Sequence, residues 1–213
     1  MPTDIFEFWR RVPANAHEHP ADRAVFARVR NHGFDLSALP GCYMGPLRTA
    51  PVVLLFLSPG SSDADRPTRA LVEWHRRTRS GNEPLVSQAT HASAYRWWTQ
   101  RIRCFECEPD ALAGKVAILN IGAYHSTTFN DHGLLAALPS SRVALDWAQR
   151  VRFPAAEAGD RVVICLRAAR YWGLETGRKY KGTLFAPNVT RGGHMHTVDR
   201  GRIVRAVKRA VLA

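Results

Sequence analysis

Four continuous runs of apolar residues predict the strands of a buried sheet. They occupy residues 52–57, 115–120, 161–166 and 183–186. None of them alternates between apolar and polar positions, as a strand with one face in water does. Continuous runs rich in β-branched residues are typical of parallel strands that helices cover on both faces. The pattern therefore predicts a four-stranded, mainly parallel sheet.

Segments with helical periodicity lie between and after these strands, at residues 66–79, 90–106, 140–150, 167–176 and 199–212. The alternation of strands and helices predicts an α/β fold, a three-layer α/β/α sandwich with right-handed crossovers. We expect Asp63 or Asp65 to cap the first of these helices and Ser140 or Ser141 to cap the third.

The first 50 residues lack a strand pattern. They predict helices near 4–11 and 21–30, followed by a loop that leads into the first strand. No internal repeat and no linker-like stretch interrupts the chain. We therefore expect a single domain over 1–213, with residues 1–50 packed on it as a helical extension.

The net charge of the chain predicts a binding partner. The 213 residues hold 30 Lys and Arg against 18 Asp and Glu, a formal net charge of +12. A field of this sign attracts polyanions, so we expect DNA as a partner, although the same arginines could serve only to solvate the surface. No apolar run approaches the ~18 residues of a spanning helix, and the start lacks the apolar core of a signal peptide. These features predict a cytoplasmic protein that has no membrane partner, with a monomer favoured.

Cysteine and histidine spacing gives weak signals for a metal. Cys104 and Cys107 have the spacing of half a metal site, but no second close pair follows. His194 and His196 would share one side of an extended segment, without a clear third ligand. We expect no cofactor, and the metal-binding capacity of Cys104 and Cys107 stays open.

Polar, Gly and Pro residues follow each predicted strand, at 58–63, 120–126, 167–172 and 187–194. In an open α/β sheet, ligands bind beyond the carboxyl ends of the strands. The sequence therefore predicts a binding cleft at this edge of the sheet.

Three short motifs at these strand ends carry a resemblance. They are Leu-Ser-Pro-Gly at 57–60, Ile-Leu-Asn at 118–120 and Ala-Pro-Asn at 186–188. Their order resembles that of the uracil-DNA glycosylase superfamily, whose first strand ends in a Pro-Gly motif, whose second ends in Leu-Leu-Asn and whose fourth ends in His-Pro-Ser or Asn-Pro-Ser. The resemblance covers residues 50–212.

The resemblance implies roles for individual residues. Pro59 and Gly60 would shape the loop that approaches the sugar-phosphate. The carboxamide of Asn120 would offer a donor and an acceptor to the edge of a flipped pyrimidine. The loop at 188–196 would enter the minor groove. The implied reaction is hydrolysis of the N-glycosidic bond to a deaminated or damaged base, without a cofactor.

The chain departs from the superfamily pattern at two positions. Ser58 stands where an Asp or Asn often orients the attacking water, and serine is not a general base at neutral pH. Ala186 replaces the histidine of His-Pro-Ser. The alternative hypothesis is a non-catalytic module of the same fold that binds nucleic acid or a nucleotide. A hydrolase or transferase acting on a small phosphorylated or nucleoside substrate is a third possibility, although the chain has no Gly-x-Ser-x-Gly elbow and no Walker loop.

The candidate residues all lie at or just past strand ends. We expect four of them to be catalytic: Ser58, Asn120, His125 and His194. We expect the following to contact DNA: Pro59, Gly60, Ser61, Arg167, Arg170, Asn188 and Arg191. The arginines follow the third and fourth strands directly. Ser58, Asn120, His125 and Asn188 should converge around one cleft.

Overall fold

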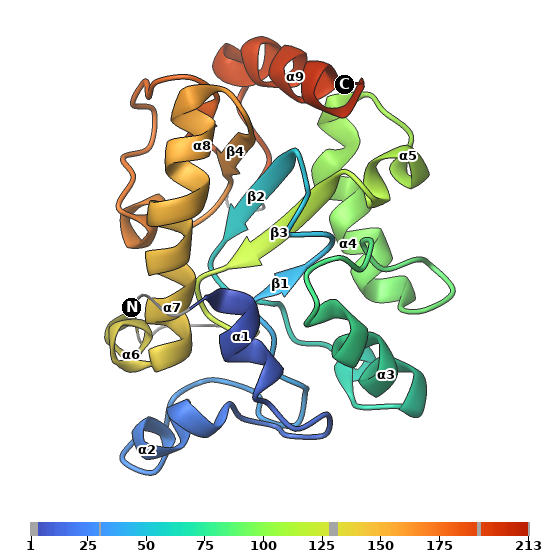
Figure 1. The fold of residues 1–213 in the computed structure, drawn as a ribbon, viewed down its shortest axis with the longest axis vertical. Helices are drawn as coiled ribbons and strands as arrows, with labels where there is room; N and C mark the ends of the chain where they lie inside the picture. Colours follow the sequence, from blue (N-terminus) through green and yellow to red (C-terminus); the bar gives the residue numbers. More distant parts are fainter. Residues whose placement is uncertain (1–3, 30, 128–131, 191–192, 213) are drawn as a thin grey trace.

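The computed structural model describes residues 4–29, 31–127, 132–190 and 193–212. They form an α/β fold around a five-stranded mixed sheet with the order β1-β3-β2-β4-β5 (Figure 1). The strands are β1 (Tyr43–Met44), β2 (Val52–Phe56), β3 (Val116–Asn120), β4 (Val162–Cys165) and β5 (Leu184–Phe185). The expected α/β class and the positions of the four predicted strands are confirmed.

Strands β2, β3, β4 and β5 run parallel, and Val52 pairs with both Val116 of β3 and Val162 of β4. The sheet differs from the predicted one by its fifth strand. β1 pairs antiparallel with β3, in a segment that the sequence indicates as loop. A two-residue strand is too short to leave a periodic pattern, and it depends on pairing with a distant strand. The Asn120 N–H, for example, donates to the Cys42 carbonyl over 2.6 Å.

Helices and loops make up the remaining described chain. The α-helices are α1 (Ile5–Arg10), α2 (Arg23–Phe26), α3 (Arg69–Thr78), α4 (Ala92–Ile102), α5 (Pro109–Ala113), α6 (His132–Ala137), α7 (Pro139–Trp147), α8 (Phe153–Ala158) and α9 (Thr197–Leu212). Short 3₁₀ turns are η1 (Pro20–Asp22), η2 (Asp63–Asp65), η3 (Arg103–Phe105) and η5 (Ala169–Trp172), and a π-helical segment, η4 (Ala148–Arg152), joins α7 to α8.

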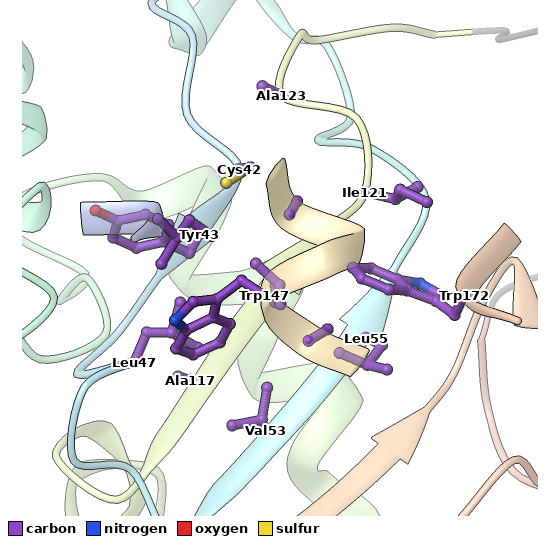
Figure 2. Close-up of a cluster of buried hydrophobic side chains, with 14 of the residues drawn as sticks. Cys42, Tyr43, Leu47, Val53, Leu55, Ala117, Ile121, Ala123, Trp147 and Trp172 are labelled. Carbon is purple, nitrogen blue, oxygen red and sulfur yellow. The ribbon is translucent and has the colours of Figure 1, made fainter. Parts of the chain in front are cut away.

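Both faces of the sheet are covered, which explains the continuous apolar runs. Val53 and Leu55 of β2 point to one face, where Trp147 of α7 and Trp172 of η5 pack on them (Figure 2). Val52, Leu54 and Phe56 point to the other face, against side chains from α3, α4 and α9. Successive residues of a strand face opposite sides, so each strand contributes to two cores.

The start of α3 differs from the expectation. Neither Asp63 nor Asp65 caps it; Thr68 does, because its hydroxyl accepts the Leu71 N–H over 3.2 Å. The two aspartates belong to η2, where the Asp65 carboxylate accepts the Ser62 N–H. Asp65 is therefore free of the helix and is available for the site described below.

Two further boundaries also differ. Ser140 and Ser141 lie inside α7, which begins at Pro139, and the Ser140 N–H donates to the Asp22 carboxylate over 3.0 Å. A residue 118 positions away thus supplies the bond that the sequence assigned to a local serine. Residues 167–176 hold only the short turn η5.

The N-terminal segment packs on the sheet and its helices. Phe6 of α1 meets Tyr43 and Trp147 edge-on. The Tyr124 hydroxyl donates to Asp22 over 2.6 Å and accepts the His19 N–H. The helix predicted near 4–11 is confirmed, whereas that near 21–30 is only the single turn of α2. In the ranges that the structure describes, no helix is long and apolar enough to cross a bilayer.

Candidate functional site

A cavity of about 270 Å³ opens where β2 and β3 end, bordered by β1, α3 and the start of α4. Its polar lining comes mainly from segments that follow these strands: Ser61, Ser62, Asp65, His75, His91, Ser93, Asn120 and His125. Its aromatic lining is Tyr43, Trp74 and Trp97. The volume is close to the lower end of ordinary small-ligand pockets, ~300 Å³.

The loops after β2 and β3 run side by side and bring Gly60 to His125. The Gly122 N–H donates to the Leu57 carbonyl, and the Ser126 N–H donates to the Pro59 carbonyl. His125 Nδ1 lies 2.6 Å from the Gly60 oxygen. A carbonyl only accepts, so Nδ1 carries the hydrogen, and Nε2 of the neutral ring is left as an acceptor.

Asp65 is the acidic group of the cavity. Its Oδ2 accepts from the Ser62 N–H over 2.6 Å and from the Ser62 hydroxyl over 2.9 Å, and it lies 3.5 Å from His125 Nδ1. Burial by itself would raise the pKa of Asp65. Hydrogen bonds from His125, His91 and Ser62 outweigh burial and hold that pKa well below its usual range. Asp65 is therefore ionised at neutral pH.

His91 links Asp65 to α4. Its Nδ1 accepts the Ala94 N–H over 3.3 Å and so caps the helix. Nδ1 must then be unprotonated, which places the hydrogen of the neutral ring on Nε2. That nitrogen donates to Asp65 Oδ1 over 3.0 Å. One imidazole thus fixes both the helix start and the carboxylate.

His75 projects from α3 into the same cavity. Burial, together with the nearby His125 and Arg79, lowers its pKa to about 3. The ring is therefore neutral near pH 7. Within the described chain it forms no hydrogen bond, so its polar nitrogens are available to a ligand.

Asn120 ends β3 and is 7% exposed. Its side-chain Oδ1 is buried and has no hydrogen-bond partner among the residues that the structure describes. A buried acceptor without a partner costs about 1–3 kcal/mol. Since Asn120 lines the cavity, a bound molecule with an N–H or O–H donor would remove that cost.

In the part of the chain that the structure describes, the cavity has no cation of its own, although the net charge of the protein is +12. Among the residues placed by the structure, no lysine or arginine belongs to its lining. Trp97 forms part of the wall and packs against Phe56, with ring centroids 4.9 Å apart. An aromatic lining, the neutral imidazole of His75 and the unpartnered amide oxygen of Asn120 suit a planar heterocycle better than a phosphate.

A basic groove of about 520 Å³ lies next to this cavity, and it contains His194. Arg101, Arg103 and Arg200 also line it. The Arg101 guanidinium lies 5.0 Å from the Trp97 ring, so the two residues connect groove and cavity. His194 is therefore placed with arginines rather than with Asn120.

The sequence-predicted residues divide accordingly. Five of them line the cavity: Pro59, Gly60, Ser61, Asn120 and His125. Ser58 is outside the lining but directly precedes Pro59, which belongs to it. Asn188 is exposed and lies against Gly177, so it does not join the other three in the expected convergence.

Two of the predicted arginines, Arg167 and Arg170, lie outside the cavity. The Arg167 side chain is 3.7 Å from a Cβ built on Gly193, beside the basic groove. Arg170 is exposed and stacks over the Tyr171 ring at 4.6 Å. Arg191 lies outside the described residues.

Three central residues, Asp65, His75 and His91, were not expected here. The sequence pattern indicates Asp65 only as one of two possible helix caps, and it gives no role to His75 or His91. One usable signal was present: His75 follows Trp74 on a helix whose other polar positions are mostly arginine and glutamate. A histidine on the buried side of such a helix is a candidate for a site.

Neither metal ligands nor comparisons with known proteins assign a function to this site. In the described ranges, no three His, Cys, Asp or Glu side chains are placed to hold a metal ion. Cys104 and Cys107 are half-buried, free thiols, and Cys165 is buried. No family model, curated protein or solved structure matches the chain significantly.

Proposed function

We propose that the protein binds DNA, takes one extruded base into the cavity and hydrolyses its N-glycosidic bond. The observation that carries this proposal is the buried, unpartnered Oδ1 of Asn120 at the cavity wall. A base edge with an N–H donor, such as N3–H of a deaminated pyrimidine, satisfies this acceptor. A flipped base also stacks on aromatic rings, which Trp97 supplies.

The distribution of charge supports the same assignment. The cavity contains the Asp65 carboxylate and the neutral His75, whereas Arg101, Arg103 and Arg200 line the adjacent groove. A base would enter the cavity, where the described lining has no cation, and the phosphates on either side of it would meet the arginines. The parallel strands β2 to β5, with helices on both faces, are compatible with a uracil-DNA glycosylase-like three-layer architecture.

The proposed chemistry uses three side chains. Water attacks C1′ of the sugar while the C1′–N bond breaks, and the base leaves with the bonding electrons. The ionised Asp65 stabilises the positive charge that develops on the sugar. His125, oriented by Gly60 and Asp65, takes a proton from the water at Nε2, which the structure leaves as an acceptor. Asn120 holds the departing base. Asp65 thus supplies the carboxylate that is missing at position 58, where the chain has a serine.

The second candidate is a module that binds a base or nucleotide and does not cleave it. The observation that favours it is the saturation of Asp65, whose oxygens already accept from Ser62 and His91. A carboxylate held in this way positions its neighbours but orients a water less readily. Base binding without cleavage distinguishes this candidate.

The test uses duplex and single-stranded oligonucleotides that contain uracil, hypoxanthine or a mismatch, incubated with protein and then cleaved with alkali. We expect strand cleavage at one modified base with the wild type, and a loss of at least tenfold with Asn120→Ala and with Asp65→Asn. Asp63→Asn is the matched control, because Asp63 is exposed and outside the cavity. Binding without cleavage would support the second candidate, and neither binding nor cleavage would overturn both.

A further inference from the structure

A second concave surface lies at the opposite edge of the sheet, where the strands begin. It is a groove of about 890 Å³ between the strand starts and α9, and we call it the amino-edge groove. One wall carries Arg202, Arg205 and Arg209 of α9, and the other carries Lys115 and Arg161, which directly precede β3 and β4. In Figure 1, α9 lies across the end of the sheet at which β2 and β3 begin.

The charge of this groove is not balanced within the protein. Its lining holds five cations and one carboxylate, Asp160. None of the five cations forms an ion pair with the described part of the chain, whereas other arginines do, such as Arg76 with Glu73 and Arg150 with Asp146. Unpaired cations gathered in a concave surface focus a positive field and attract anions.

The spacing of the cations favours a long anion over a single phosphate. Arg202, Arg205 and Arg209 are three and four residues apart, so they follow one side of α9 over roughly 10 Å of its axis. Lys115 and Arg161 face them from the other wall. Cations spread along both walls do not converge on one point, as the ligands of an isolated phosphate do. They match a chain of phosphates.

The groove surface also leaves room for a backbone to approach. Gly114 and Gly159 belong to its lining, and a Cβ at either position would meet no atom within 4 Å. Arg205 and Arg209 are exposed, and neither forms a side-chain hydrogen bond or ion pair with the described residues. Arg202 instead stacks over Phe185, with 4.9 Å to the ring centroid, which fixes its guanidinium at the groove.

We propose that the amino-edge groove is a second nucleic-acid site, which binds a phosphodiester backbone without regard to sequence. The base cavity lies beyond the other ends of the same strands, roughly 16 Å away for a five-residue strand. One molecule then engages two segments of nucleic acid, one at each edge of the sheet. This inference goes beyond the proposed function, since base recognition does not require it.

The test is a fluorescence-anisotropy titration of a labelled 20-base-pair duplex of unmodified sequence, at salt concentrations from 50 to 200 mM. The variant is Arg205→Glu/Arg209→Glu. The control is Arg28→Glu/Arg142→Glu, which makes the same charge change at exposed arginines outside the groove. Each lost phosphate contact lowers the log–log salt slope by about 0.9. We expect the groove variant to lose about two such contacts and the control none.

A second measurement tests the two-segment arrangement. One duplex carries a donor dye and another an acceptor dye, and energy transfer between them is expected with wild-type protein but not with the groove variant. Arg205→Gln/Arg209→Gln should give the same loss, which guards against misfolding by charge reversal. Equal slopes for groove variant and control, or arginine-dependent binding to phosphatidylserine vesicles but not to DNA, would overturn the proposal. Cleavage or base binding at the cavity would be unaffected by that outcome, so failure of one proposal is distinguishable from failure of the other.

Discussion

His91 donates its Nε2–H to Asp65 Oδ1 over 3.0 Å and so connects two segments that are 26 residues apart. The same ring caps α4 through Nδ1, which fixes the tautomer. Because Asp65 also receives the N–H and hydroxyl of Ser62, the carboxylate is held in one orientation at the cavity wall. The orientation of the charged group in the cavity therefore depends on the residue that caps α4.

Asp65→Asn tests how much this arrangement stabilises the fold. At pH 7 we expect the free energy of unfolding to fall by about 2 kcal/mol, because hydrogen bonds to a charged acceptor are lost and an amide N–H₂ faces donors. The folded pKa of Asp65 is depressed, so its stabilisation is present above the unfolded value of ~3.9 and is lost as the pH falls below it. Urea unfolding should show the gap between wild type and variant narrowing from pH 4 to pH 3. A gap of constant size would contradict the assigned charge.

His75→Gln tests the neutral imidazole in the cavity. The folded pKa of His75, about 3, is below the unfolded value of ~6.5, so protonation favours the unfolded chain. The stabilising contribution of neutral His75 is thus fully present above pH 6.5. Below that pH, the free energy of unfolding of the wild type falls by up to ~1.4 kcal/mol per pH unit. Chemical denaturation from pH 7 to pH 5 should show a shallower decline for the variant. Parallel declines would show that His75 does not titrate as the structure implies.

Asn120→Ala separates ligand binding from stability. Because Oδ1 has no partner in the described chain, its removal eliminates an unsatisfied buried acceptor, and we expect a melting temperature no more than a few degrees below that of the wild type. Binding of free uracil or another base, followed by quenching of tryptophan fluorescence, should weaken at least tenfold. Ser93→Ala, elsewhere in the cavity lining, serves as the control. A large loss of stability would mean that Asn120 supports the fold instead.

Tyr124→Phe tests how the N-terminal segment is attached. The hydroxyl of Tyr124 donates to Asp22 over 2.6 Å, deep in the structure. Its loss leaves a buried carboxylate with one donor fewer, which costs about 1.5–3 kcal/mol. Thermal unfolding should show this loss, and Tyr95→Phe, with a partly exposed ring on α4, should change stability by less than about 0.5 kcal/mol. Equal effects would argue against the Asp22 bond as a structural link.

The strands β2 to β5 and the helices α1, α3, α4 and α9 could be predicted from the sequence. Each of these elements buries its own residues in a regular period, and that period is visible locally. β1 could not be found, because two residues carry no period and pairing with β3 alone makes them a strand. The hydrogen bond from the Ser140 N–H at the start of α7 could not be predicted either, because its acceptor, Asp22, is distant in the sequence.

The residues of the site also divide into those that the sequence predicts and those that it does not. The sequence alone places Asn120 and His125 at the carboxyl edge of the sheet, because they lie at and just past the end of a parallel strand and such strands end together. The meeting of Asp65, His75 and His91 with these residues depends on the tertiary structure. These three come from crossover segments between β2 and β3, and their positions depend on how α3 and α4 pack across the sheet. Such packing is set by contacts between distant residues, which no local pattern records.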